Sequence, residues 1–201
     1  NQDELLQEGI QKISHWKEEL KNYDIAYINQ VIDDICQYPK TVVHELLEGC
    51  TLDNSGLQAW SDHHLYFSDH ILFQLFSRSE HPDFISAKVV VIRQAKGFTS
   101  LNGLEKATDV QALLIGNSNT LTDISALGKL YKFKRGLNNA FVRTQLFLQN
   151  LSAVKDFSCL EKMQANEIEF NNLPHLTDGQ QFEKMTGGYG LTKLSLERCG
   201  I

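Results

Sequence analysis

Short stretches in the second half of the chain alternate between apolar and polar residues. They are centred on Leu113 and Ile115, Leu146 and Leu148, Ile168 and Phe170, and Leu194 and Leu196. Alternation with a period of two is typical of a strand that buries one face. An uninterrupted apolar run, VVVI, lies within 88–93 and predicts a further, buried strand. We therefore expect a series of strands from residue 88 onward.

Most of these strands open copies of one pattern that is 17 residues long. Four copies align without a gap, at 91–107, 114–130, 147–163 and 169–185. Every copy has a lysine at the same position, and the last three share the asparagines Asn117, Asn150 and Asn172 and the aspartates Asp123, Asp156 and Asp178. Apolar residues three apart, such as Leu121, Ile124 and Leu127, predict that each copy returns through a helical or tight turn on the opposite wall.

The copies resemble leucine-rich repeats. They begin 23, 33 and 22 residues apart, and periods of about 20–29 residues with apolar strand positions are typical of that family. The run LTDISALGKL at 121–130 resembles the return half of an internalin-type repeat. The segments SLNGLEKATDV and ALLIGNSNTLTDI are also similar to repeats of receptor L-domain proteins, and LSLERCGI at 194–201 follows the family's strand pattern.

The resemblance covers roughly residues 88–201 and implies an α/β fold. In such a leucine-rich-repeat solenoid, parallel strands form the concave face, and short helices or turns form the convex face. The family places a ladder asparagine three residues after the second strand leucine, whereas Asn117, Asn150 and Asn172 follow it by two. Residues 131–145 interrupt the spacing, and we interpret them as a degenerate repeat or an inserted loop.

The first 84 residues have the periodicity of helices. Helices are expected over 3–21, over 25–38 with Asp24 as its cap, over 41–48 and over 56–77. The last of these would bury Trp60, His64, Phe67, Ile71, Leu72, Leu75 and Phe76. The open end of a solenoid exposes apolar side chains and unpaired backbone, which a cap must cover. We therefore predict an N-terminal all-α cap in 1–84 and the solenoid in 85–201.

Composition narrows the possible functions. Apolar residues make up 42% of the 201 residues and charged residues 22%, which predicts a folded, soluble protein. The net charge of −6 and the absence of a basic block disfavour nucleic-acid binding. No run of 18 apolar residues predicts a membrane span. The four cysteines form no CxxC pair, and free buried thiols favour a reducing intracellular compartment.

Candidate chemistry is sparse. His44 and Glu48 are spaced like part of a zinc-protease helix motif, but no third ligand is evident. His63 and His70 would share a helix face about 10.5 Å apart, which is too far for one metal ion. His64 falls on the apolar stripe of the same predicted helix. No nucleophile motif and no phosphate-binding loop is present, so we predict a protein that is not an enzyme and needs neither cofactor nor metal.

A protein partner is the remaining expectation. On the predicted strands, alternate side chains point away from the core. They are Arg93, Leu114, Phe147, Gln149, Glu169, Asn171, Ser195 and Glu197. Leu114 and Phe147 are apolar where solvent is expected, so we predict that a protein binds this concave face. One alternative is the sensor or substrate-recognition part of a larger signalling protein, enzyme or bacterial effector, suggested by the missing initial methionine. The other is a metal protein or enzyme built on the helical unit and its histidines.

Overall fold

The structure is a computed structural model that describes residues 1–50, 63–136, 143–186 and 190–201. It is an α/β fold with a six-stranded parallel sheet and an N-terminal helical region. The α-helices are α1 (Gln2–Glu19), α2 (Ile25–Ile35), α3 (Lys40–Leu47), α4 (His70–Arg78), α5 (Pro82–Ile85) and α6 (Gly179–Thr186). The strands are β1 (His64–Asp69), β2 (Val89–Lys96), β3 (Ala112–Ser118), β4 (Gln145–Leu151), β5 (Glu167–Asn171) and β6 (Lys193–Glu197).

Helices α1, α2 and α3 confirm the first three predicted helices. The side chain of Asp24 accepts hydrogen bonds from the backbone N–H groups of Ala26 and Tyr27, at 2.9 and 3.2 Å, and so starts α2 as expected. Trp16 of α1 is buried, and its indole N–H donates to Asp34 at 3.3 Å. No helix among the described residues is both long enough and apolar enough to cross a bilayer.

The prediction of one helix over 56–77 is wrong for its described part. Residues 64–69 form strand β1 and residues 70–78 form helix α4, while 56–62 and Trp60 lie outside the described residues. Leu65 and Phe67 are buried and alternate with partly or fully exposed side chains, as a strand requires. Parallel pairing with the VVVI run of β2 supplies backbone partners that local periodicity cannot reveal. The sheet therefore begins at His64 rather than at residue 88.

The strands follow one another in the sheet in chain order, β1 to β6. Corresponding residues of the aligned copies are register partners, so that Ile115 lies beside Leu148 and Leu148 beside Phe170. β3 pairs directly with β4 in the sheet, and a short 3-10 helix, η3 (Tyr131–Phe133), lies in the described part of the segment between them. Leu137 and Asn139, which suggested a further strand start, lie outside the described residues.

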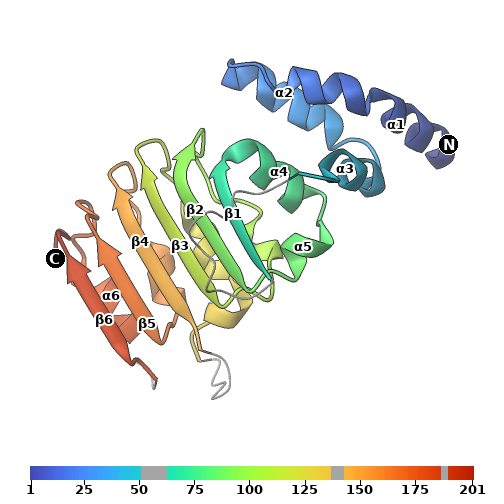
Figure 1. Cartoon of the computed structure of the whole chain (residues 1–201). Helices are drawn as coiled ribbons and strands as arrows, with labels where there is room; N and C mark the ends of the chain where they lie inside the picture. Colours follow the sequence, from blue (N-terminus) through green and yellow to red (C-terminus); the bar gives the residue numbers. More distant parts are fainter. Residues whose placement is uncertain (51–62, 137–142, 187–189) are drawn as a thin grey trace.

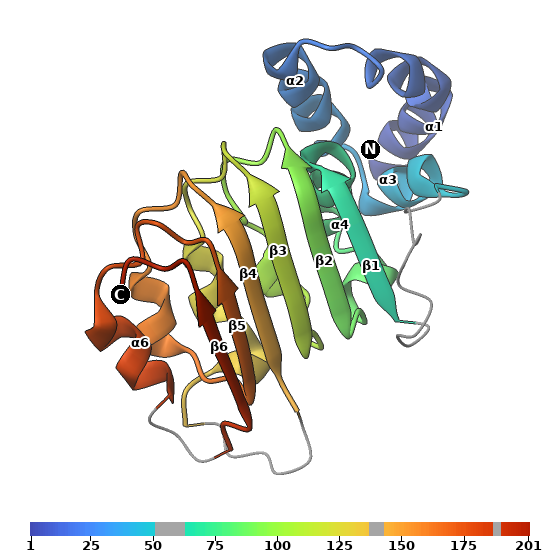
Figure 2. The ribbon, with the colours of Figure 1, turned by 60° about the vertical axis from the view of Figure 1, so that its left-hand side comes forward.

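Short helices cover one face of the sheet. They are the 3-10 helices η1 (Leu104–Lys106), η2 (Ser125–Lys129) and η4 (Ser158–Lys162), followed by α6. Leu104, Leu127 and Leu160 are 0% exposed, and Phe182 of α6 is 9% exposed. These side chains complete the core that the inward residues of the strands begin. Figure 1 shows α6 behind β5 and β6, and in the turned view of Figure 2 it lies to one side of β6; the front of the sheet in Figure 1 carries no helix among the described residues.

The shared asparagines lie where each strand ends. Asn117, Asn150 and Asn172 have positive φ angles of 58°, 51° and 53°, as do Gln94 and Arg198 at the matching positions of β2 and β6. Asparagine tolerates this left-handed conformation better than most residues. The side chains also form a ladder: Asn150 donates to Asn117 at 2.7 Å, and Asn172 donates to Asn150 at 3.0 Å. The asparagines therefore turn the chain at the end of the sheet, two residues after the second strand leucine.

The shared aspartates shape the turns that follow. Asp123, Asp156 and Asp178 each accept a hydrogen bond from the backbone N–H two residues ahead, at 2.8–2.9 Å. Hydrogen bonds from Ser125 and Ser158 hold the pKa values of Asp123 and Asp156 below their ordinary values. The constant spacing between asparagine and aspartate in the copies therefore has two structural causes. The asparagine adopts a positive φ at the end of the strand, and the aspartate accepts a backbone hydrogen bond in the turn that follows.

Candidate functional site: the open face of the sheet

The candidate site is the face of the sheet opposite the short helices, which we call the open face. Strand register arranges its side chains in rows that cross the strands. The first row is His64, Val89, Ala112, Gln145, Glu167 and Lys193. The middle row is Tyr66, Val91, Leu114, Phe147, Glu169 and Ser195. The last row is Arg93, Gly116, Gln149, Asn171 and Glu197.

All eight residues predicted to face away from the core lie in these rows. The middle row contains Leu114, Phe147, Glu169 and Ser195, and the last row contains Arg93, Gln149, Asn171 and Glu197. Arg93 and Glu197 are exposed, and the other six are partly exposed. The structure therefore brings the predicted residues together on one continuous surface, with Gly116 as the remaining member of the last row.

The middle row is apolar over its first four strands. Tyr66, Val91, Leu114 and Phe147 are register neighbours on β1, β2, β3 and β4. Neighbouring strands lie about 4.8 Å apart, so this apolar stripe is roughly 14 Å long. Val91 is 4% exposed, while the other three side chains remain partly exposed. Cross-strand neighbours of this kind stabilise the sheet, and their exposed portions leave an apolar surface to solvent.

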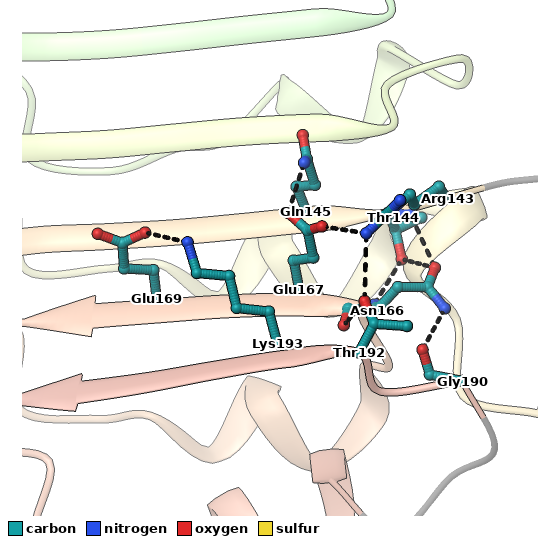
Figure 3. A network of polar contacts seen from close by, with 9 residues as sticks. All are labelled: Arg143, Thr144, Gln145, Asn166, Glu167, Glu169, Gly190, Thr192 and Lys193. Carbon is teal, nitrogen blue, oxygen red and sulfur yellow. Dashed lines mark hydrogen bonds and ion pairs between the residues drawn. The ribbon is translucent and has the colours of Figure 1, made fainter.

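The other half of the open face is polar, and its charges are paired. Figure 3 shows Glu167 accepting hydrogen bonds from Arg143 and, at 2.6 Å, from Gln145. Lys193 lies 3.7 Å from the carboxylate of Glu169. Both carboxylates are partly buried, with side-chain exposures of 13% and 35%, so each pair is partly shielded from solvent. These contacts link β4, β5 and β6 across the first and middle rows.

Asn166 anchors the entry to these strands. Its side-chain oxygen accepts from the backbone N–H of Thr144 at 2.8 Å and from the Thr144 hydroxyl at 3.2 Å. Its side-chain N–H donates to the backbone oxygen of Gly190 at 2.8 Å. The hydroxyl of Thr192 donates to the backbone oxygen of Asn166 at 3.2 Å. One amide therefore fixes three chain segments at the edge of the polar half.

Arg93 differs from the charged residues of the polar half. In the described ranges, no carboxylate lies within ion-pair distance of Arg93, although Glu167, Glu169 and Lys193 all have partners. The carboxylate of Glu197 also has no ion pair there and accepts one hydrogen bond, of 3.4 Å, from Asn171. The open face thus has an apolar half with an unpaired cation beside it, and a polar half whose charges are mostly paired.

Sequence reasoning missed several members of the open face. Tyr66 was assigned to a helix, although the alternation in residues 64–68 was the signal that could have revealed it. Val89 and Val91 were assigned to a strand buried on both sides, because an uninterrupted apolar run does not distinguish its faces. The first row was also missed on β4, β5 and β6, where it contains Gln145, Glu167 and Lys193. The polar contacts of these residues depend on strand register, which the sequence pattern does not show.

The histidines considered for metal binding are dispersed. His44 bonds to the backbone oxygen of Ser79 at 2.9 Å, and its ring packs against that of His81 with centroids 5.0 Å apart. His63 and His70 do not share a helix face, because strand β1 separates them, and His64 lies in β1. Among the described residues, no group of three or more histidine, cysteine, aspartate or glutamate side chains is arranged to hold a metal ion.

Buried His70 instead connects parts of the fold. Its Nε2 lies 3.0 Å from the side-chain oxygen of Asn29 in α2. Gly97, with a φ of 73°, approaches so closely that an added Cβ would lie 2.4 Å from the His70 ring. Burial lowers the pKa of His70 below its ordinary value.

No protein-family model matches the chain, and comparisons with curated proteins and with solved structures find no similar protein.

Proposed function

We propose that this protein is a leucine-rich-repeat solenoid that binds a protein partner on the open face of its sheet. The observation that carries the proposal is the apolar stripe of Tyr66, Val91, Leu114 and Phe147. Aromatic and aliphatic side chains gathered on one rigid surface are the usual source of binding energy in protein interfaces. Polar side chains border the stripe, as they border the apolar centre of most such interfaces.

The assignment as a leucine-rich repeat is supported by features that recur from copy to copy. The asparagines adopt the same left-handed turn, the aspartates accept the same backbone hydrogen bond, and inward leucines are register partners. A segment of this kind cannot bury its apolar residues alone, so stability must come from its neighbours. The rigid, extended surface that results suits protein recognition.

Phe147 provides the decisive test, because it is the aromatic residue of the stripe that lies on β4, one of the two middle strands of the sheet. A partner is first identified by affinity capture with the intact chain, and its affinity is measured by titration calorimetry. Phe147→Ala should weaken binding by about 2 kcal/mol or more while the melting temperature changes little. Tyr131→Ala is the matched control, because Tyr131 is 52% exposed and lies outside the three rows.

Normal affinity and normal stability of Phe147→Ala would exclude the open face as the binding surface. Unfolding of the variant would instead show that Phe147 belongs to the structural core. If Tyr131→Ala and Phe147→Ala weaken binding equally, the partner contacts a larger surface than the stripe. The proposal requires a loss of binding that is specific to Phe147.

A further inference from the structure

We infer that the segment recognised by the open face places an apolar side chain on the middle row and a carboxylate against Arg93. This inference rests on the proposed function, since it specifies the chemistry of the partner for the same surface. It commits to one class of ligand, a peptide segment in which an aromatic or aliphatic residue stands close to aspartate or glutamate.

The first step concerns the position of Arg93. Arg93 follows Val91 by two residues on β2, so both side chains are on the open face, about 6.6 Å apart along the strand. Leu114 is the register partner of Val91 on the next strand. The guanidinium is exposed and has no hydrogen bond or ion pair among the described residues. A free cation therefore stands beside the apolar stripe.

The second step concerns the space next to Arg93. In the last row, Gly116 separates Arg93 from Gln149. A Cβ added to Gly116 would lie 3.3 Å from the backbone oxygen of Gln149 and 3.4 Å from its Cβ. Gly116 therefore carries no side chain between Arg93 and Gln149, and the Gln149 side chain lies against this glycine, with its Oε1 3.9 Å from the same Cβ position. The guanidinium of Arg93 is a hydrogen-bond donor, so an acceptor of the partner can bind it beside the glycine.

The third step concerns charge. The nearer carboxylates of the open face, Glu167 and Glu169, are already paired with Arg143 and Lys193. Glu197 stands four strands away in the same row, which is about 19 Å at the usual strand spacing. That distance exceeds the Debye length of about 8 Å at physiological ionic strength. Arg93 is therefore not neutralised from within the described chain, and it is available to an anion of the partner.

The fourth step selects the anion. A guanidinium and a carboxylate form a bidentate, charge-assisted pair whose charges match one to one. A phosphate carries about two negative charges and is usually bound by several cations. The described residues of the rows offer one unpaired cation, Arg93, so a carboxylate fits better. The neighbouring stripe then requires an apolar side chain close to that carboxylate in the same segment.

The test uses a displayed library of random 12-residue peptides and the whole chain as bait. The unmodified protein should enrich peptides in which an aromatic or aliphatic residue lies within about three residues of aspartate or glutamate. Selection on Arg93→Glu should replace the acidic residue by lysine or arginine. Arg93→Gln should bind the peptides selected on the unmodified chain at least about tenfold more weakly, as expected for loss of a charge-assisted hydrogen bond.

Arg135→Glu is the matched control. Arg135 is exposed and follows η3, outside the three rows, so its reversal changes the net charge equally without touching the open face. The control should enrich the same acidic peptides as the unmodified protein. If Arg135→Glu shifts selection as Arg93→Glu does, the effect comes from overall charge and the inference is overturned.

Two other outcomes separate the inference from the proposed function. Peptides that bind through Phe147 but show no acidic preference, and that bind Arg93→Glu unchanged, would overturn the inference and leave the open face as a binding surface. Peptides that bind independently of both Arg93 and Phe147 would overturn both proposals. Failure to enrich any peptide would overturn the inference, because its ligand is a short linear segment, and would leave the proposed function to the test with Phe147→Ala.

Discussion

The two ends of the sheet have the same strand pattern but very different burial. At β1, the inward residues Leu65 and Phe67 are 8% and 1% exposed. At β6, the residues in the same register rows, Leu194 and Leu196, are 45% and 38% exposed. Alternation in the sequence therefore determines which way a side chain points, whereas burial depends on elements supplied by other parts of the chain.

What distinguishes the β1 end is a cluster of aromatic residues. The ring of Phe67 lies 5.5 Å from that of Phe73, 6.0 Å from Phe76 and 6.2 Å from Phe84, measured between centroids. These partners come from α4 and α5, immediately after β1. Within the part of the chain that the structure describes, no strand pairs with the outer edge of β6. The N-terminal region therefore contributes a strand and part of the core, in addition to helices.

Polar contacts connect the preceding helices to this end. Arg78 of α4 lies 2.7 Å from Asp33, which belongs to α2, and Lys40 of α3 pairs with Glu80. Because both pairs are exposed, their contribution to stability is small. The buried residues of α2 and α3 nevertheless belong to the same hydrophobic core as the sheet.

Removal of residues 1–84 should abolish cooperative folding of the remaining chain. It removes β1 and α4 and exposes Val90 and Ile92, which are both 0% exposed in the structure. The bared edge of β2 would also have unpaired backbone groups, which promote aggregation. Thermal melts and size-exclusion chromatography measure the outcome. Removal of 199–201, at the exposed end, should leave a cooperative melt, and a monomeric, cooperatively melting 85–201 would contradict the comparison.

Alanine substitutions at matched positions should show a smaller but clear asymmetry. Phe67→Ala should lower the free energy of unfolding by about 3–5 kcal/mol, because it leaves a cavity among packed rings. Leu196→Ala, in the same register row but partly exposed, should cost no more than about 1 kcal/mol. Denaturant unfolding of both variants measures the difference. Equal losses would show that the β6 end is as well packed in solution as the β1 end.

Two capping aspartates offer a finer comparison. Asp69 begins α4 by accepting from the backbone N–H groups of Ile71 and Leu72, at 2.9 and 3.4 Å, whereas Asp178, before α6, accepts from one backbone N–H group among the described residues, that of Gln180. Asp69→Ala should cost about 1 kcal/mol, and Asp178→Ala should cost less. Asp69→Asn retains an acceptor and should be nearly neutral. Chemical denaturation of the three variants tests this order, and a larger loss at Asp178 would reverse it.

The sequence predicted the fold best where each copy repeats its neighbour. The strand pattern in 112–118, 145–151 and 167–171 and the leucines behind it could be identified from spacing alone, since each copy faces an equivalent copy. Strand β1 could not be identified in this way. Its apolar residues fit a helical period as well as a strand period, and pairing with Val89–Ile92 decides between them.

The candidate site was predicted in part for the same reason. The eight predicted residues lie in two adjacent rows because the outward side was correctly assigned for Arg93 on β2 and for the residues of β3 to β6. Tyr66 was missed together with its strand. The ion pairs of Glu167 and Glu169 were missed because they join residues 24 positions apart through register and loop geometry. These pairs matter for the candidate site, because Glu167 and Glu169 already have cationic partners and Arg93 has none among the described residues.

The smallest expected effect is a dependence of stability on pH, and it arises at the β1 end. Burial lowers the pKa of His70, so the folded protein disfavours the protonated form that the unfolded chain adopts below about pH 6.5. His70 therefore does not change the free energy of unfolding above that pH. The free energy of unfolding falls as the pH decreases from about 6.5 toward the lower pKa of the folded state. His81, whose pKa is also lowered by burial, acts in the same direction.

Denaturant unfolding at pH 7.5 and pH 5.5 measures this loss without interference from the carboxylates. The pKa values of Asp123, Asp156 and Glu80 are lowered, so these groups remain ionised in both states until the pH is well below 5.5. His70→Gln should reduce the difference in stability between the two pH values but should not abolish it, because His81 remains. His175→Gln, at an exposed position after β5, is the control for loss of a histidine outside the β1 end. An undiminished difference in His70→Gln would show that groups other than His70 cause the loss of stability at low pH.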